Sequence, residues 1–322
     1  MASQAQSSSQ VQAVQAVGMT VSNIEQATQF YTGAFTFEKV SDITVSGEAY
    51  DYLLGVFGSQ LRIVTLKLGQ ETLRLMEYIS PKGRPAPVDS QSHDLWFQHF
   101  AIIVSDLDRA YDRLKQFSFT PISTALQTIP ESNEASAGIR AYKFKDADGH
   151  NLEILQFPPD KGADRWHQST DNLFLGIDHS AISVSSTQQS LTFYRDLLGL
   201  SVGGGSLNTG KTQEYLDNLF AAKVQVTSLE PAQGGLGVEL LDYLTPPGGR
   251  PMPVDQRSND LTHVQLELVV NDLAAAVEAL SQQAVQFVSP RVIELTDAQA
   301  PFRKGALIRD PDGHSLLLVE NR

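Results

Sequence analysis

The hydrophobic and polar positions of the chain follow one pattern that occurs four times. Each time, an apolar strand-like run leads through a polar helix-start signal into apolar residues at three- and four-residue spacing, which is typical of an amphipathic helix. The four stretches are residues 15–31, 98–114, 178–194 and 264–280. Shorter apolar runs follow each helix and end in LRLMEY, NLEILQF, VELLDYL and SLLLVEN. The pattern predicts four units, each with one strand, one helix and about three further strands.

The start of each predicted helix carries a side chain suited to cap it. Ser22 and Ser185 are each followed three residues later by Glu or Gln, which fits the capping box, where two side chains satisfy free backbone N–H groups. Asp106 and Asp272 are expected to cap the other two helices. These signals place the beginnings of all four helices.

Longer motifs recur at a nearly constant distance along the chain. EYISPKGRPAPVDSQSHDL returns as DYLTPPGGRPMPVDQRSNDL, 165 residues later (77 to 242). KDADGHNLEIL returns as RDPDGHSLLLV, 164 residues later (145 to 309). Self-similarity at a fixed period indicates a repeat architecture. The chain therefore consists of two similar halves, each with two units.

We predict two domains joined by a polar linker, with a disordered polar tail in front. The tail spans residues 1–11, the first domain 12–157, the linker 158–175 and the second domain 176–322. The units are 12–79 and 96–157 in the first domain, and 176–245 and 261–322 in the second, connected by Pro/Gly loops at 80–91 and 245–256. Pairing two such units gives a curved half-barrel sheet with helices outside, so the expected fold class is α+β with two half-barrels.

Charge and composition narrow the possible partners. The net charge is −13 with pI near 4.9, and no cluster of Lys and Arg is present. Nucleic acids and anionic membrane surfaces both require such clusters, so a small molecule is the expected partner. No apolar run approaches the roughly 18 residues of a membrane span. The opening residues lack the features of a secretory signal, which favours a cytoplasmic location, although removal of a leader would give the same sequence.

The chain contains no cysteine. Disulfides, thiolate zinc sites and cysteine nucleophiles are therefore excluded. Any metal ion must be held by His, Asp, Glu, Gln or water.

The fourfold unit order, the helix end SLTFYRDLLGL at 190–200 and the hairpin DPDGHSLLLVE at 310–320 resemble the vicinal oxygen chelate superfamily. That superfamily includes glyoxalase I, bleomycin-resistance proteins, methylmalonyl-CoA epimerase and extradiol dioxygenases. The resemblance covers nearly everything from residue 12 to 321. It implies a fold and a type of site rather than one reaction, because the scaffold supports many chemistries.

The resemblance implies that each unit offers two inward positions to a metal ion, one on its first strand and one on its last. These positions are Ala16 and Arg74 in the first unit, His99 and Glu153 in the second, His179 and Glu239 in the third, and Gln265 and Leu317 in the fourth. The middle units are complete, the first has no usable ligand, and the fourth offers only an amide oxygen. Histidine and carboxylate ligands suit a divalent ion such as Ni, Co, Zn, Mn or Fe.

Two closures of the barrels are compatible with the sequence. If each half closes on itself, one barrel contains His99 and Glu153, and the other contains His179, Glu239 and Gln265. If the second unit pairs with the third and the first with the fourth, all four His and Glu ligands share one barrel. The completeness of that set favours the second closure, whereas the polar residues of the fourth unit favour the first. The sequence leaves both open.

Further residues are candidates for contact with a substrate. Ser183 alternates with the histidine of the third unit and is expected to share its face. His263 and Glu267 alternate with the fourth-unit glutamine in the same way. Arg140 and Lys304 occupy matching strand positions before the two DxDG turns, where they could face a substrate carboxylate.

Other polar residues have structural interpretations. His150 and His314 follow DG in hairpin turns, so we assign them to turn chemistry. The two DxDG stretches lack the glutamate that a calcium loop requires, and they are read as turns. Arg84 and Arg250 recur in the two GRP loops and are expected to brace them.

The leading hypothesis is a metal-dependent isomerase or lyase that acts on a small carbonyl or hydroxy compound through a metal-stabilised enediolate. The resemblance implies that Glu153 or Glu239 leaves the metal and acts as the catalytic base. The alternatives are a non-enzymatic drug- or metabolite-binding protein and a ring-cleaving extradiol dioxygenase with a two-His, one-carboxylate iron site. A monomer and a homodimer are both compatible with the duplication.

Overall fold

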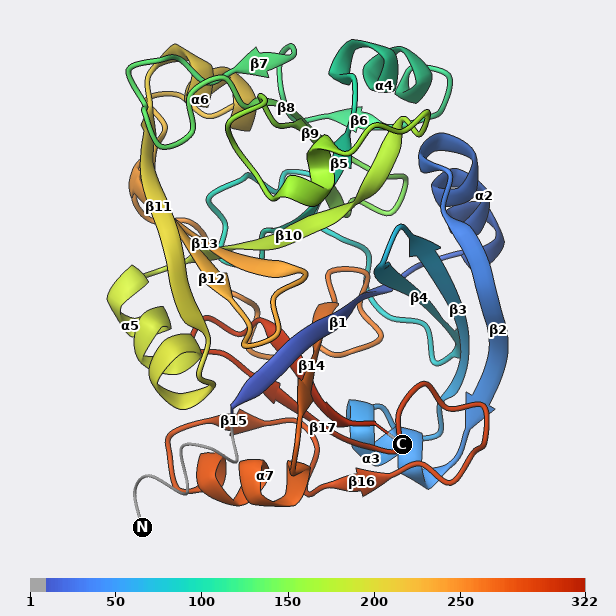
Figure 1. Ribbon diagram of the computed structural model, residues 1–322. Helices are drawn as coiled ribbons and strands as arrows, with labels where there is room; N and C mark the ends of the chain where they lie inside the picture. The colour runs from blue at the N-terminus through green and yellow to red at the C-terminus, as the bar shows by residue number, and fades with distance from the viewer. Residues whose placement is uncertain (1–9, 322) are drawn as a thin grey trace.

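The computed structural model describes residues 10–321, which form two large curved sheets with helices on their outer sides (Figure 1). This arrangement confirms the α+β class. Residues 1–9 of the expected tail lie outside the described residues. Val11, placed in the tail from the sequence, is instead fully buried at the start of the first strand.

The four units have the predicted order, with small additions. The first unit comprises β1 (Val11–Thr20), α2 (Ile24–Phe35), β2 (Glu38–Ser46), α3 (Glu48–Leu54), β3 (Gln60–Leu68) and β4 (Glu71–Ser80). The second comprises β5 (Gln98–Val104), α4 (Leu107–Leu114), β6 (Thr120–Pro121), β7 (Gln127–Thr128), β8 (Arg140–Lys145) and β9 (Asn151–Gln156). A 3₁₀ turn, η1 (Asp164–His167), follows in the linker.

The second half repeats these elements. The third unit comprises β10 (Phe174–Val184), α5 (Thr187–Leu191), the π-helical turn η2 (Thr192–Leu197), β11 (Ser201–Thr209), α6 (Lys211–Asp217), β12 (Lys223–Glu230) and β13 (Gly237–Thr245). The fourth comprises β14 (Val264–Val270), α7 (Leu273–Ser281), β15 (Gln286–Phe287), β16 (Ile293–Glu294), β17 (Lys304–Arg309) and β18 (Ser315–Glu320). Units one and three each contain an additional short helix, α3 or α6. Units two and four instead contain a second two-residue strand, β7 or β16.

The sheets follow the second of the two closures. One sheet has the order β15-β17-β18-β14-β1-β4-β3-β2 and joins unit four to unit one. The other has the order β11-β12-β13-β10-β5-β9-β8-β6 and joins unit three to unit two (Figure 1). The first strands of the units pair antiparallel at both junctions, β1 with β14 and β5 with β10. Each sheet therefore draws one unit from each half of the chain, and the sheets do not coincide with the halves 12–157 and 176–322.

The two faces of the strands have different surroundings. On β10, Ile182 and Val184 belong to the largest apolar cluster, which packs beneath the helices and contains residues from all four units. Ala181 belongs to a separate, smaller cluster inside the sheet of units two and three. Because side chains alternate along a strand, one face of the sheet packs beneath the helices and the opposite, inner face can line a cavity.

Two of the predicted helix caps are displaced by one residue. Asn23 and Ser186, not Ser22 and Ser185, accept the hydrogen bonds from the first turns of α2 and α5. The backbone N–H of Ser22 donates to Asp148 on the hairpin of unit two, 2.8 Å away, and that of Ser185 donates to the equivalent hairpin of unit four. Ser22 and Ser185 thus bind hairpins that are distant in sequence and do not cap the helices. The aspartate caps Asp106 and Asp272 are present as predicted.

The arginine of each GRP loop forms ion pairs with aspartates in the other half of the chain. Arg84 donates to the buried Asp260 and to Asp255, while Arg250 donates to the buried Asp94 and to an exposed aspartate of the opposite loop. The two arginines therefore brace the loops as expected, but each does so by binding the opposite half of the chain. No helix among residues 10–321 has the length and apolar character needed to cross a membrane.

Candidate metal and substrate site

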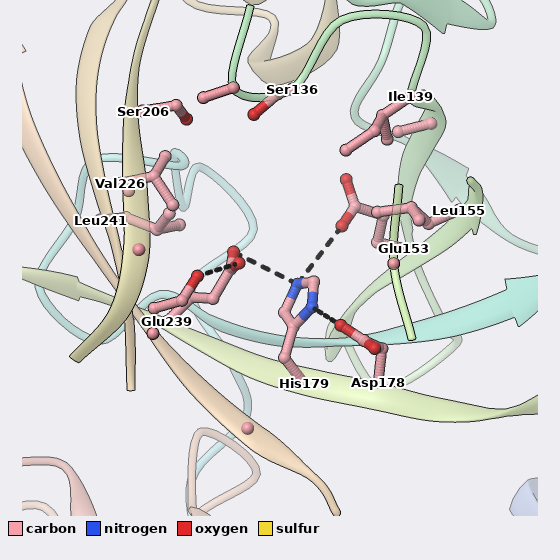
Figure 2. Close-up of a pocket in the computed structure, with 18 of the residues that line it drawn as sticks. Ser136, Ile139, Glu153, Leu155, Asp178, His179, Ser206, Val226, Glu239 and Leu241 are labelled. Carbon is pink, nitrogen blue, oxygen red and sulfur yellow. Dashed lines mark hydrogen bonds and ion pairs between the residues drawn. The ribbon is translucent and has the colours of Figure 1, made fainter. Parts of the chain in front are cut away.

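A cavity of about 910 Å³ lies inside the sheet of units two and three (Figure 2). Its walls carry apolar side chains, among them Ile139, Leu155, Val226 and Leu241. The strand β11 contributes only backbone at Gly204, where an added Cβ would meet open space. The glycines of this strand therefore keep one wall of the cavity open.

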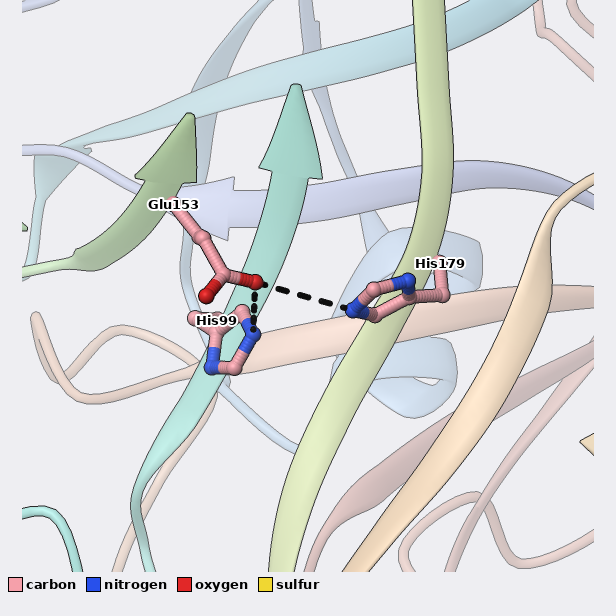
Figure 3. Close-up of side chains that lie close together, drawn as sticks. All are labelled: His99, Glu153 and His179. Atoms are coloured by element: carbon pink, nitrogen blue, oxygen red, sulfur yellow. Dashed lines mark ion pairs between the residues drawn. The ribbon is translucent and has the colours of Figure 1, made fainter. Parts of the chain in front are cut away.

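Four side chains with metal-binding groups converge at the base of this cavity. They come from four strands: His99 from β5, Glu153 from β9, His179 from β10 and Glu239 from β13. Nε2 of His99 lies 3.3 Å from Oε2 of Glu153, and Nε2 of His179 lies 3.8 Å from the same oxygen (Figure 3). Nε2 of His179 also lies 3.4 Å from Oε2 of Glu239 (Figure 2). The unit pairing thus brings the four predicted ligands together.

The spacing of these atoms suits a single ion. Two ligand atoms that are each about 2.1 Å from one ion lie roughly 3.0 to 3.4 Å apart. The potential ligand atoms of His99, Glu153 and His179 all lie within 4.8 Å of one another. Glu239 is not part of that compact group and reaches it through His179.

The surroundings of His99 also indicate a missing partner. The side chain is buried, and neither ring nitrogen forms a hydrogen bond of good geometry among the described residues, although Nε2 faces Oε2 of Glu153 at 3.3 Å. Leaving a buried polar group unpaired costs about 1–3 kcal/mol, so such groups are rare. Burial lowers the pKa of His99 and keeps the imidazole neutral, which is the form that binds metals. The donor set therefore fits a divalent ion.

His179 is oriented by the residue that precedes it. Nδ1 of His179 lies 3.0 Å from Oδ2 of Asp178 (Figure 2). Oδ1 of Asp178 accepts a 2.8 Å hydrogen bond from the Trp166 indole. With Nδ1 donating to this carboxylate, Nε2 is the nitrogen directed at the glutamates. Carboxylates commonly orient metal-binding histidines in this way. The sequence did not identify Asp178 or Trp166 as site residues.

The carboxylates around His179 favour its protonated form when no metal is bound. Burial alone would lower the pKa of His179, but the nearby Glu239, Asp178 and Glu153 outweigh it and raise the pKa to about 9. Burial would raise the pKa of Glu153, but His99, Lys143 and His179 outweigh it and lower the pKa to about 2. The centre is thus rich in negative charge, which a divalent cation would neutralise.

The two glutamates differ in their access to the cavity. The Glu153 side chain is only 6 % exposed, whereas that of Glu239 is 24 % exposed. Oε1 of Glu239 accepts a 3.0 Å hydrogen bond from the Ser228 hydroxyl, which leaves Oε2 directed at His179. Of these two glutamates, Glu239 is therefore the more accessible to a molecule in the cavity.

A buried lysine lies beside these ligands and was not found from the sequence. Lys143 on β8 is paired in register with Glu153 and donates a 2.8 Å hydrogen bond to the buried Asp217. Burial would lower the pKa of Lys143, but Asp217, Glu153 and Glu239 outweigh it and raise the pKa. Asp217 also accepts hydrogen bonds from Tyr243 and Gln213. A fixed positive charge thus helps to keep Glu153 ionised.

Several residues predicted for this site lie elsewhere, because units one and four form the other sheet. The amide oxygen of Gln265 accepts a 3.0 Å hydrogen bond from Nε2 of His263 within the buried interior of that sheet. Glu267 binds Arg74 there, and Lys304 binds Glu320. The expected contribution of these four residues to the site of His179 is therefore corrected: Gln265, His263, Glu267 and Lys304 belong to the sheet without the His–Glu pairs.

Two other expected contacts are engaged by protein groups. Arg140 pairs with Asp108 near the surface at 2.8 Å, and it does not line the cavity. The Ser183 hydroxyl donates a 2.7 Å hydrogen bond to the carbonyl of Ser92, and Ser183 does not line the cavity either. The expectation that these side chains face a substrate is corrected. The turn assignment for His150 holds, since its ring binds Asp146 at 2.9 Å.

Comparison with known proteins adds two findings. The family model described as "Glyoxalase/Bleomycin resistance protein/Dioxygenase superfamily" matches residues 13–154 and 176–318. No curated protein sequence matches the chain.

Similar solved structures include glyoxalase I from Zea mays, at 14 % identity and a TM-score of 0.59, covering 96 % of this chain and 92 % of that one. They also include a putative dioxygenase from Bacillus subtilis, at 12 % identity and a TM-score of 0.58, covering 97 % of this chain and 86 % of that one. At these identities the likeness shows a shared fold.

Proposed function

Because the chain belongs to the Glyoxalase/Bleomycin resistance protein/Dioxygenase superfamily, we propose that it is a metal-dependent isomerase or lyase acting on a small carbonyl or hydroxy compound. The observation that carries this proposal is the convergence of His99, Glu153, His179 and Glu239 at the base of one cavity. A divalent ion would be held by these residues. When bound, it would stabilise negative charge that develops on a substrate oxygen.

In this proposal the residues of the chain divide the remaining work. His99, Glu153 and His179 fix the position of the ion, and Asp178 fixes the orientation of the His179 ring. Glu239 takes a proton from the substrate carbon and returns it at the neighbouring position. Its exposed edge supports this role, since a general base must come within hydrogen-bond reach of the proton that it removes. The apolar wall of Ile139 and its neighbours would hold the rest of the substrate.

Metal content and proton transfer are the first things to measure. Protein purified without chelators is expected to contain about one equivalent of Ni, Co, Zn, Mn or Fe. Under nitrogen and in D₂O, it is expected to exchange the proton on the hydroxyl-bearing carbon in a panel of α-hydroxyketones and α-hydroxyaldehydes. A Glu239→Gln variant should retain the metal and lose roughly 10²–10⁴-fold in rate. Glu230→Gln is the matched control, because Glu230 lines the same cavity outside the ligand cluster.

A second function has one specific observation in its favour. The compact group His99, Glu153 and His179 is a set of two histidines and one carboxylate, which is typical of non-haem Fe(II) oxygenases. In a dioxygenase Glu239 would not bind the metal. Oxygen uptake with a catechol that survives Glu239→Gln would therefore replace the isomerase proposal. Protein free of all five metals that still binds small molecules would indicate a non-enzymatic binder.

A further inference from the structure

The sheet of units one and four contains a smaller cavity of about 250 Å³. It lies on the inner face of β2, β3 and β4, and its lining includes Ser41, Ile43, Thr65, Lys67 and Arg74. A loop before β17 contributes Gln299 at its edge. None of the residues assigned to the metal cluster lines this cavity.

Strand register shows that this cavity is the counterpart of the metal-site cavity. Thr65 lies opposite Arg74, and Ser41 lies opposite Thr65, in the ladders of β2, β3 and β4. In the ladders of β11, β12 and β13, Ser228 lies opposite Glu239 and Gly204 lies opposite Ser228. Both ladders have an irregularity one residue before Ser41 or Gly204. The two cavities can therefore be compared position by position.

The comparison shows an inversion of charge. Arg74 occupies the position of Glu239, and Lys67 occupies the position of Glu230. Side chains also replace the glycines of β11, because Ser41 stands where the other cavity has Gly204. The counterpart cavity is therefore smaller and has cations where the metal-site cavity has carboxylates.

The cations of the second cavity are only partly neutralised. Nε of Arg74 donates to both oxygens of the buried Glu267 at 2.8 and 2.9 Å, and Nη1 donates to Thr65 at 3.1 Å. Nη2 of Arg74 has no hydrogen-bond partner among residues 10–321, and the side chain is 11 % exposed. Lys67 is exposed and forms no ion pair among the same residues; Glu38, opposite it on β2, is also exposed. Because Glu267 neutralises Arg74, the two cations of the lining together with Glu267 leave one positive charge without a paired carboxylate.

We propose that this second cavity binds a small organic carboxylate. Arg74 and Lys67 would receive the carboxylate, because a guanidinium offers forked donors suited to its two oxygens. Ile43 and the apolar side chains beside it would pack against a short aliphatic part. The volume is below the roughly 300 Å³ at which drug-sized ligands begin to fit, which limits the ligand to a short-chain acid. This proposal does not depend on the activity proposed for the other cavity.

Titration of the full chain with butyrate tests the proposal. The protein is stripped of metal, so that the carboxylates of the other cavity repel anions. In amide-resolved NMR spectra, butyrate is expected to shift Thr65 and Thr72 and to leave Ser228 unchanged. Lys67→Glu should weaken binding about tenfold, because it replaces an attraction by a repulsion at close range. The double variant Arg74→Met, Glu267→Met should abolish binding without leaving a buried charge unpaired.

The controls separate a built site from general attraction to anions. Lys211→Glu makes the same change in net charge on an exposed helix of unit three and should leave the butyrate affinity unchanged. Inorganic phosphate, which lacks an aliphatic part, should bind more weakly than butyrate. Equal affinity of the wild type and Lys67→Glu, or shifts confined to Ser228 and its neighbours, would overturn the proposal. Isomerase activity is not a readout, so a failure here leaves the proposed function unaffected.

Discussion

The substitution Asp178→Asn tests how the site controls its central histidine. Asp178 now accepts on both oxygens, from His179 Nδ1 at 3.0 Å and from the Trp166 indole at 2.8 Å. An asparagine retains the shape but offers one acceptor and one donor. If its oxygen remains with Trp166, its amide faces Nδ1 and favours the histidine tautomer with a proton on Nε2. If it turns round, two donors meet at Trp166.

Both orientations make metal binding less favourable. In the first, the proton must leave Nε2 and a hydrogen bond must be lost before the ring can bind an ion. In the second, a partly buried donor is left unpaired, at about 1–3 kcal/mol. Loss of such supporting carboxylates typically weakens metal binding 10- to 100-fold. The metal dissociation constant of Asp178→Asn is therefore expected to rise by that factor, while the protein remains folded.

Competition with a chromophoric chelator measures this constant. The matched control is Asp310→Asn, because Asp310 pairs with His314 at 2.9 Å in a buried hairpin of the other sheet. That variant should lose stability and keep the metal affinity of the wild type. An unchanged metal affinity in Asp178→Asn, with circular dichroism unchanged, would refute the orienting role. An equal loss in both variants would show that the effect comes from folding.

Three further outcomes are expected from the same structure. Arg84→Ala should lower the free energy of unfolding in urea by about 2 kcal/mol, less than for a fully buried pair, since Arg84 is half exposed while Asp260 is buried. Removing the metal with EDTA should lower the melting temperature by roughly 5–10 °C, reversibly, and not in His179→Ala. Burial would lower the pKa of His150, but Asp146 outweighs it and raises the pKa to about 9. The ion pair therefore stabilises the folded protein fully below the unfolded pKa near 6.5, and this stabilisation is lost as the pH rises through 9. Urea midpoints from pH 6 to 10 should show this slope, and His150→Gln should reduce it.

The positions of the candidate metal-binding residues could be predicted because the resemblance to the vicinal oxygen chelate superfamily implies them and the duplication repeats them. A histidine at the start of one strand and a glutamate inside another recur in two units, and side chains on a strand alternate between its faces. The resemblance implied the pairing of His99 with Glu153 and of His179 with Glu239, and the recurrence of that pair in two units supported it. The pairing of the units could not be predicted, because all four first strands have similar apolar patterns. The pairing of β5 with β10, and that of β1 with β14, joins strands from different halves of the chain.

Asp178 shows a different limit. Neighbouring residues of a regular strand point to opposite faces, so the sequence places Asp178 away from the face of His179. In the structure the ladder between β5 and β10 is irregular from Ile177 to Ser180, and this irregularity includes Asp178 and His179. Bulges re-aim side chains and are frequent beside functional sites. The irregularity lets two adjacent residues meet, which no periodic pattern indicates.

Residues around Asp178 also connect the sheet of units one and four to the sheet of units two and three. Glu71, on β4 of the first sheet, accepts hydrogen bonds from Arg165 and from the backbone of Ile177. The Arg165 guanidinium lies 3.8 Å from the centre of the Trp166 ring, and Trp166 in turn donates to Asp178. A carboxylate from unit one thus fixes the linker residues that support Asp178 and, through it, His179 of unit three. Because this contact needs units one and three in neighbouring sheets, the pairing of the units shapes the metal site beyond supplying its ligands.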